Sequence, residues 1–266
     1  MNQALPVVNR QRNRACRLAV VVGAMIIQGG LLLGPTAAIQ NENQAEKEAN
    51  LKGQIFGGLF NRWTFDQQNA DEFPIDFSQL SIGEESTGVW VIGSDAAAPS
   101  PPNMLKAASS CRNGSCYRML VANKLQYEYP DVSVRLRFPT EGGVGQGGIV
   151  IGLTGAKQFY AAVVDLAAKH LKVIRVLDGQ VAVLGQTAIT PKVVDWHSLR
   201  IQRNTIISKD FIETFFDGEL LLSIQDQSLG LGQVGLVVGG NSSLHFDSLH
   251  AVPLFSQRPL SAPAAY

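Results

Sequence analysis

The fold is decided by residues 196–224, which read WHSLRIQRNTIISKDFIETFFDGELLLSI. Near the start, Leu199 and Ile201 alternate with polar neighbours, which is the period of a strand with one buried and one solvated face. The same period resumes further along and ends at Asp217-Gly218. This dipeptide is typical of a two-residue hairpin turn, because both central residues must take positive φ. An apolar strand then returns, so the stretch predicts a three-stranded antiparallel meander.

Further strands are expected along most of the chain. Asp178-Gly179 predicts a second hairpin, and the unbroken apolar run 148–153 predicts a strand that is central or buried on both faces. A Pro-rich loop at 94–103 cannot supply ladder donors inside a sheet. Outside the meander, the expected strands are 63–66, 88–92, 132–138, 148–153, 159–164, 171–177, 181–184, 233–238 and 244–247. Short strands with turns between them and no long helical period predict an all-β sandwich or jelly roll.

The N-terminus has the layout of an export signal. Residues 1–38 combine an arginine-rich start, an apolar run at 18–33 and small residues before Ile39. This pattern predicts a signal peptide, which would be helical, with an uncleaved membrane anchor as the alternative. A polar linker at 39–57, a folded domain at 58–255 and a disordered tail at 256–266 are then expected. We therefore predict export to the periplasm, cell envelope or exterior, with membrane contact only through the N-terminal segment.

Charge and cysteine content narrow the class of protein further. The chain of 266 residues has 22 basic and 22 acidic side chains, and this balance gives no electrostatic footprint for a nucleic-acid partner. In an exported protein, Cys111 and Cys116 are expected to form a disulfide across a short loop, because the compartment is oxidising. Free thiols are the alternative.

An ordered set of weak motifs resembles the 3-keto-disaccharide hydrolase domain family. The motifs are Trp63-x-Phe65-Asp66, Trp90, Ala98-Pro99-Ser100-x-Pro102-Asn103, Phe159-Tyr160, Trp196-His197-x-Leu199-Arg200, Phe216-Asp217-Gly218, Gly232-x-Val234-Gly235-Leu236 and Phe246-Asp247. The resemblance implies a two-sheet jelly roll, similar to laminin-G-like and other concanavalin A-like domains, whose concave face often handles carbohydrate. That family usually continues the Phe-Tyr strand with polar and basic residues, whereas Ala and Val follow Tyr160 here.

No catalytic residues are predicted. The sequence contains neither a Gly-x-Ser-x-Gly elbow nor a His-Glu-x-x-His motif. Residues 143–148 match Gly-x-Gly-x-x-Gly, but a strand-like run follows where a dinucleotide site needs a helix. Glu213 and Asp217 lie about 13 Å apart along one strand, too far for a glycosidase acid pair. His197 is expected to be a core-edge histidine with a backbone partner.

Candidate ligand-binding residues are expected at the alternating strand positions that form the polar face of a sheet. Arg135 and Arg137 can orient hydroxyl groups, and Tyr160 and Trp90 can stack on sugar rings. The alternative for both arginines is that they only solvate an outer face.

Calcium is the only cofactor that the sequence suggests. Asp66 and Asp247 each follow a Phe in the first and last strands, which pair in concanavalin A-like folds, where calcium is often bound nearby. The alternative is that the two carboxylates cap turns or solvate a sheet edge.

Three functions remain open at this level. The sequence favours a non-catalytic carbohydrate-binding or adhesion-type module with a glycan or saccharide ligand. One alternative is a glycoside hydrolase or lyase acting on a (keto-)disaccharide. Another is a structural envelope protein that binds another protein.

Overall fold

A computed structural model gives the fold of residues 60–83, 87–111, 116–139 and 145–254. All described residues belong to one compact unit. The predicted signal peptide, the linker at 39–57 and the tail at 256–266 lie outside the described residues. Within the described residues, the structure has no helix long and apolar enough to span a membrane.

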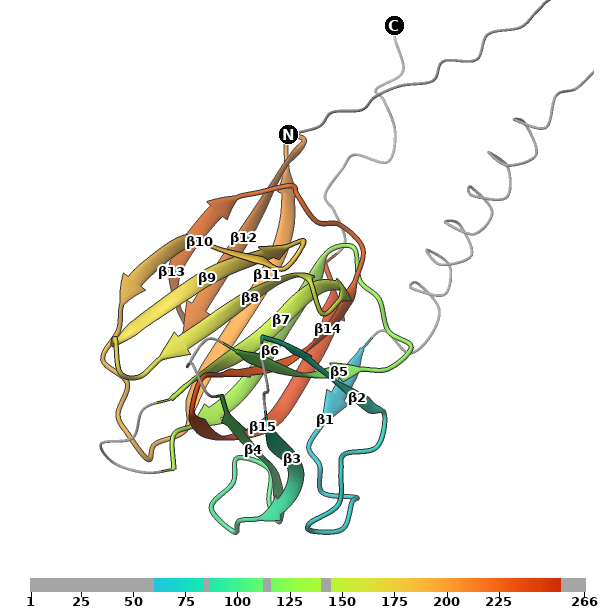
Figure 1. Ribbon diagram of the computed structural model, residues 1–266, viewed down its shortest axis with the longest axis vertical. Coiled ribbons are helices and arrows are strands. Elements are labelled where there is room, and N and C mark those ends of the chain that lie inside the picture. The colour runs from blue at the N-terminus through green and yellow to red at the C-terminus, as the bar shows by residue number, and fades with distance from the viewer. Residues whose placement is uncertain (1–59, 84–86, 112–115, 140–144, 255–266) are drawn as a thin grey trace, which may run out of the picture. The chain divides into compact units, whose positions relative to one another are not determined.

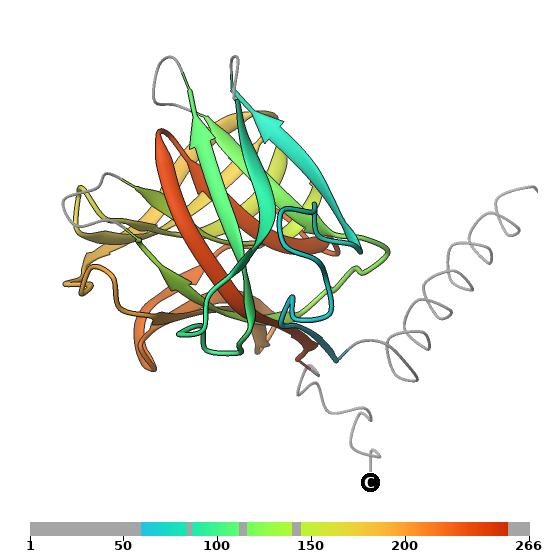
Figure 2. The ribbon, with the colours of Figure 1, turned by 90° about the horizontal axis from the view of Figure 1, so that it is seen from below.

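Fifteen strands in the described residues form two antiparallel sheets, arranged as two layers (Figure 1 and Figure 2). The strands are β1 (Asn61–Trp63), β2 (Phe77–Ile82), β3 (Thr87–Ser94), β4 (Asn103–Ser110), β5 (Tyr117–Ala122), β6 (Pro130–Arg137), β7 (Gln146–Gly155), β8 (Gln158–Asp165), β9 (His170–Leu177), β10 (Gln180–Ala188), β11 (His197–Ile206), β12 (Lys209–Phe216), β13 (Glu219–Gln225), β14 (Gln233–Gly239) and β15 (Ser242–Pro253). Sheet A has the order β13-β12-β11-β6-β15-β4-β3, and β1 pairs with β15. Sheet B has the order β10-β9-β8-β7-β14-β5-β2. The predicted all-β, two-sheet sandwich is therefore confirmed.

The meander predicted from residues 196–224 is present as β11, β12 and β13. Leu199 of β11 lies opposite Phe216 of β12. The turn that follows has φ of 50° at Asp217 and 88° at Gly218, as a hairpin of this type requires. The second predicted hairpin joins β9 to β10 through Asp178-Gly179, with φ of 50° and 81°.

The predicted strands need two corrections: the first strand has other bounds, and three strands of the structure were not predicted. β1 ends at Trp63 instead of continuing to Asp66, because Phe65 takes φ of 67°, which leaves the extended region. The strands absent from the prediction are β2, β4 and β5. In β4 the residues are NMLKAASS, whose Ala and Ser are depleted in strands, so side-chain propensity gave no signal.

The main core lies between the two sheets. Alternate residues of each strand point into it, as Leu199 and Ile201 do from sheet A and Tyr160 and Ala162 do from sheet B. A second apolar cluster uses the other face of sheet B alone, and its members are Met119, Val121, Val150, Leu153, Phe159, Ala161, Val163, Ile174, Val176 and Val237. The prediction for 148–153 is confirmed, because β7 is buried on both faces. Sheet A therefore carries the polar face of the sandwich.

Candidate functional site

The outer face of sheet A is polar along its central strands. The half-buried, outward residues of β6 are Asp131, Ser133, Arg135 and Arg137. Ser198 of β11 lies opposite Arg135, and His245 of β15 lies opposite Arg137. Residues directly opposite each other on an antiparallel pair share one face. The structure thus places the two arginines singled out from the sequence on the same surface.

Arg137 is held in a network at one end of this face. Its Nη2 donates to Asp95 Oδ2 at 2.5 Å and contacts His245 Nδ1 at 2.9 Å. Its guanidinium also lies 4.7 Å from the centre of the Trp196 ring, within cation–π range. Burial, followed by the charges of Arg137 and Lys106, lowers the pKa of His245 to about 4. The imidazole is therefore neutral near pH 7 and accepts the hydrogen bond from Arg137.

A cavity of about 300 Å³ opens on the same face, next to Arg135. Its polar lining residues are Arg62, Ser133, Arg135, Ser198, Ser248 and His250, with Pro99 and Val134 completing the wall. The lining comes from β1, β6, β15, the start of β11 and the loop before β4. This volume is at the lower end of the range of small-molecule sites, and three serine hydroxyls supply both donors and acceptors.

Four nitrogen atoms in and beside the cavity have no hydrogen-bond partner within the described residues, although each is buried. They are Arg135 Nε, Arg137 Nε, Trp196 Nε1 and His250 Nε2. Arg135 is otherwise held by one bond, from Nη2 to the carbonyl of Trp196 at 3.1 Å.

Most of the cavity lining was not singled out from the sequence. Ser133 and Ser198 could have been found, because they share strand parity with Arg135 and with Arg200. Ser248 could not, because it takes φ of 51° inside an irregular stretch of β15 that breaks the two-residue period. Such bulges re-aim side chains and leave no clear sequence signature.

Trp90 lies away from this surface. Only 2% of it is exposed, and its ring packs 6.1 Å from that of Phe246 in the core between the sheets. A ring at this depth packs against protein on all sides and does not share a surface with Arg135 and Arg137.

Tyr160 is also buried in the core, where it has a different role. Its hydroxyl donates a short hydrogen bond to Asp226 and accepts one from the Leu229 amide at 3.0 Å. Asp226 in turn forms an ion pair with Arg175 at 2.6 Å. Burial and the bond to Asp226 raise the pKa of Tyr160 to about 12, so the hydroxyl keeps its proton. Tyr160 therefore fastens the loop after β13 to sheet B.

The structure brings Asp66 and Asp247 together around Ser100. The Ser100 amide donates to Asp247 Oδ2 at 2.6 Å, and the Ser100 hydroxyl donates to Asp66 Oδ2 at 2.8 Å. The remaining oxygens accept from the amides of Asn103 and Ser248, at 3.1 Å and 2.5 Å. The two carboxylates thus anchor the Pro-rich loop between β3 and β4 to the first and last strands of the fold.

This arrangement does not fit a calcium ion. Calcium takes about six to eight oxygen ligands, whereas all four carboxylate oxygens here already accept hydrogen bonds from protein donors. No group of three or more His, Cys, Asp or Glu side chains suited to a metal occurs in the described part of the chain. The two aspartates fit the alternative given by the sequence, in which carboxylates cap a turn.

His197 is a structural residue at the end of β11. It is 5% exposed, its ring stacks on Phe216, and its nitrogens contact Asp217 Oδ2 at 2.7 Å and the Lys192 carbonyl at 2.8 Å. Both ring nitrogens are engaged, so neither faces a group whose proton it could accept. The expected core-edge histidine with a backbone partner is confirmed.

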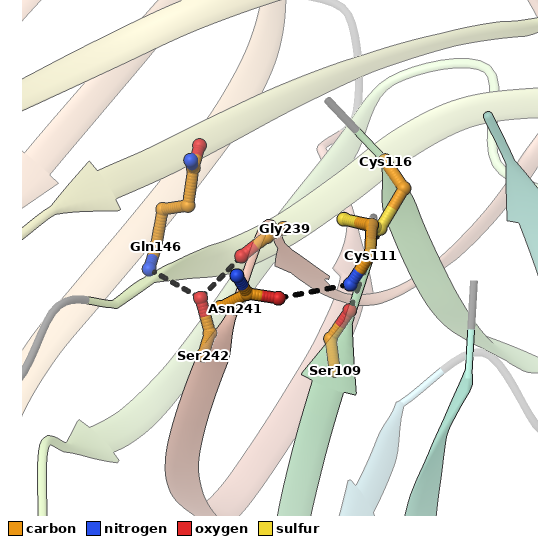
Figure 3. The surroundings of a disulfide bond; sticks show 7 residues. All are labelled: Ser109, Cys111, Cys116, Gln146, Gly239, Asn241 and Ser242. Atoms are coloured by element: carbon orange, nitrogen blue, oxygen red, sulfur yellow. Dashed lines mark hydrogen bonds between the residues drawn. A yellow bond between two sulfur atoms is a disulfide. The ribbon is translucent and has the colours of Figure 1, made fainter. Parts of the chain in front are cut away.

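Cys111 and Cys116 form the predicted disulfide, with their Cα atoms 6.1 Å apart. Figure 3 shows that the disulfide lies beside the turn between β14 and β15 and contacts it through a hydrogen bond. The Cys111 amide donates to Asn241 Oδ1 at 2.9 Å, and the Gly240 amide donates to the Cys116 carbonyl at 3.0 Å. The disulfide closes the connection from β4 to β5, and these hydrogen bonds hold it against the connection from β14 to β15. Both connections pass from one sheet to the other.

Fold and surface together define a two-sheet, antiparallel jelly-roll sandwich of the concanavalin A-like kind, with a polar cavity on the outer face of one sheet. No protein-family model and no curated protein matches the sequence. Among solved structures, the chain is similar to the carbohydrate-binding module CBM66 from Bacillus subtilis, with a TM-score of 0.52 and 16% identity over 66% of this chain and 95% of that one.

Two further solved structures are similar at a TM-score of 0.48. One is the cellulose induced protein Cip1, with 13% identity over 73% of this chain and 98% of that one. The other is a protein of unknown function from Shewanella oneidensis MR-1, with 10% identity over 84% of this chain and 95% of that one. At such identities the likeness to CBM66 shows the fold, and the resemblance to 3-keto-disaccharide hydrolase domains stays a prediction from motifs.

Proposed function

We propose that this protein is an exported, non-catalytic saccharide-binding module whose site is the cavity on the outer face of sheet A. The observation that carries the proposal is the polar lining of this cavity, where Arg62, Arg135, three serines and His250 come together. Sugar hydroxyls are acceptors as well as donors and can form hydrogen bonds with all of these side chains. The likeness to a carbohydrate-binding module supports the proposal by analogy of fold.

The chemistry of the cavity wall supports binding without turnover. Its lining residues include no aspartate or glutamate, so the wall supplies neither a general acid nor a nucleophile for glycoside hydrolysis. A serine nucleophile would need a base beside it, and His250, which lies opposite Ser133 in the same wall, is the lining residue that could act as one.

A glycan array probed with the protein tests the proposal, followed by titration of the bound glycans. Arg135→Ala is expected to weaken binding by about 10- to 100-fold, because it removes a charge-assisted donor from the wall. Lys157→Ala is the matched control, since this exposed cation lies on the turn between β7 and β8, away from the cavity. Equal affinity of both variants and the parent for every bound glycan would place the site elsewhere.

Hydrolysis of a keto-disaccharide is the second candidate, favoured by the ordered motifs and by the pairing of Asp66 with Asp247 around Ser100. Incubation with disaccharides and 3-keto-disaccharides, followed for product, tests it. Turnover that disappears in Asp66→Asn or Asp247→Asn, in a variant that stays folded, would replace the binding proposal with an enzymatic one.

Export is part of the proposal and has its own test. The mature chain should begin near Ile39, and N-terminal sequencing of protein recovered from the cell envelope or medium measures this. A retained Met1 would favour the uncleaved anchor.

A further inference from the structure

The cavity on sheet A is cationic. Two of its lining residues, Arg62 and Arg135, are arginines, and no lining residue is acidic. Arg62 lies directly opposite His250 across the β1–β15 pair, so its charge enters the same cavity. Burial and the nearby charge of Arg62 lower the pKa of His250. That histidine is therefore neutral at pH 7 and can contribute a donor or an acceptor.

Elsewhere on the described part of the chain, four arginines form ion pairs with aspartates. The pairs are Arg137–Asp95, Arg175–Asp226, Arg200–Asp131 and Arg203–Asp210. Within the same residues, Arg62 and Arg135 form no ion pair. The contrast is clearest for Arg200 on β11, which is paired with β6, the strand of Arg135. Arg200 donates two hydrogen bonds of 2.6 Å each to Asp131.

The nearest carboxylates are turned to other partners. Asp247 lies opposite Arg135 in the β6–β15 register, but it is 0% exposed and accepts from Ser100 and Ser248. Asp66 accepts from Ser100 and Asn103. Neither residue lines the cavity, so the two guanidinium groups face it without a counter-charge from its walls.

We infer that the ligand of this cavity is an acidic saccharide, a glycan whose sugar rings carry carboxylates as uronic acids do. This inference rests on the proposed function and names its ligand class. A guanidinium group binds a carboxylate with two parallel hydrogen bonds, and the three serine hydroxyls suit the ring hydroxyls beside it. A neutral sugar would leave both charges unmatched, whereas a carboxylate would form an ion pair with the guanidinium groups of Arg62 and Arg135.

The experiment compares matched ligands. Oligosaccharides of glucuronate, galacturonate and mannuronate are titrated into the protein by calorimetry, each beside its twin in which the carboxylates have been reduced to primary alcohols. The twins keep the ring and its linkages and lose only the charge. Inorganic polyphosphate serves as an anion that is not a saccharide.

At least one acidic oligosaccharide is expected to bind about 10- to 100-fold more tightly than its reduced twin, and salt should weaken that binding. Tight binding of neutral glycans or reduced twins, without preference for the acid, would overturn the inference and leave the proposed function standing. Binding of no glycan at all would overturn the proposed function itself. Polyphosphate that binds as tightly as the acidic glycans would show that charge alone is recognised, which also overturns the inference.

Substitutions in the cavity wall test which arginines bind the carboxylate of the ligand. Arg62→Gln and Arg135→Gln remove charge and keep a hydrogen-bonding amide, so each should erase most of the preference for the acid over its twin. Lys157→Gln, with the same change of charge outside the cavity, should leave that preference unchanged. Circular dichroism of each variant confirms that it is folded. A preference that survives in the double arginine variant would overturn the inference.

Discussion

Asp247 offers a sharp test of the energetics around Ser100. Its carboxyl is 0% exposed, and burial, assisted by the neighbouring charge of Asp66, raises its pKa to about 6. The amides of Ser100 and Ser248 act in the opposite direction, because they favour the ionised form. The perturbation is Asp247→Asn, which removes the titrating group and keeps its shape.

The magnitude follows from linkage between protonation and folding. The ordinary pKa of this carboxyl is 3.8, so the folded protein raises it by about 2 pKa units, worth ~3 kcal/mol. A folded-state pKa above the unfolded one means that the folded protein holds the proton more tightly. The contribution of Asp247 to the free energy of unfolding is therefore most favourable below pH 4. It is lost as the pH rises to about 6 and is constant above that.

Histidines would mask this effect in the parent protein alone. Burial lowers the pKa of His245 to about 4, so the unfolded chain takes up its proton before the folded protein does. That difference reduces stability as the pH falls through the same window and opposes the contribution of Asp247. Both proteins in the comparison keep His245, so its contribution cancels in the difference between parent and variant.

Urea unfolding at a series of pH values from 4 to 7 measures that difference. The free energy of unfolding of the parent minus that of Asp247→Asn should increase by ~3 kcal/mol as the pH falls across this range. Asp195→Asn, an exposed carboxylate outside the loop anchor, is the control and should give a nearly flat difference. A difference that stays flat for Asp247, or decreases toward pH 4, would refute the reasoning, since the two amides would then outweigh burial.

The remaining predictions concern the core, the disulfide and metal. Leu199→Ala should lower the free energy of unfolding by about 2–5 kcal/mol in the same urea assay, because this side chain is fully buried in a central strand of the meander; a loss within error of zero would contradict its place in the core. Non-reducing mass spectrometry should find the peptides of Cys111 and Cys116 linked and two hydrogens lighter, and complete alkylation without reductant would exclude the bond. Adding calcium or a chelator should leave the melting temperature unchanged, and a calcium-dependent increase that Asp66→Asn abolishes would show that the carboxylates bind the ion after all.

The sequence allows good predictions where residues alternate and poor ones where they do not. On β6, buried Val134 and Leu136 alternate with Arg135 and Arg137, and this period by itself assigns the two arginines to one face. On β8 every residue from Phe159 to Val164 is buried, so the period carries no information about which face Tyr160 takes. The prediction of a surface position for Tyr160 is wrong for this reason, since the residue belongs to the core.

Long-range pairing explains the other differences. Asp66 and Asp247 can be linked from the sequence, since the first and last strands are expected to pair, and β1 does pair with β15. Their shared partner, Ser100, lies in a Pro-rich loop whose path no local pattern determines. The four hydrogen bonds that these carboxylates accept depend on that path, so the choice between a metal site and a turn anchor needs the three-dimensional arrangement.

The asymmetry of the two sheets limits where a ligand can bind. The central strands of sheet B are apolar and buried on both faces, and they offer a polar ligand few partners for its hydroxyl groups. Sheet A turns one apolar face to the core and a polar face outward, and on that face most charges are already paired within the protein. At the cavity, Arg62 and Arg135 have no ion-pair partner among the described residues and lie beside serines and a neutral histidine. Arg135 is half-buried and Arg62 is exposed beside it, so both guanidinium groups can form ion pairs with a ligand that brings its own negative charge.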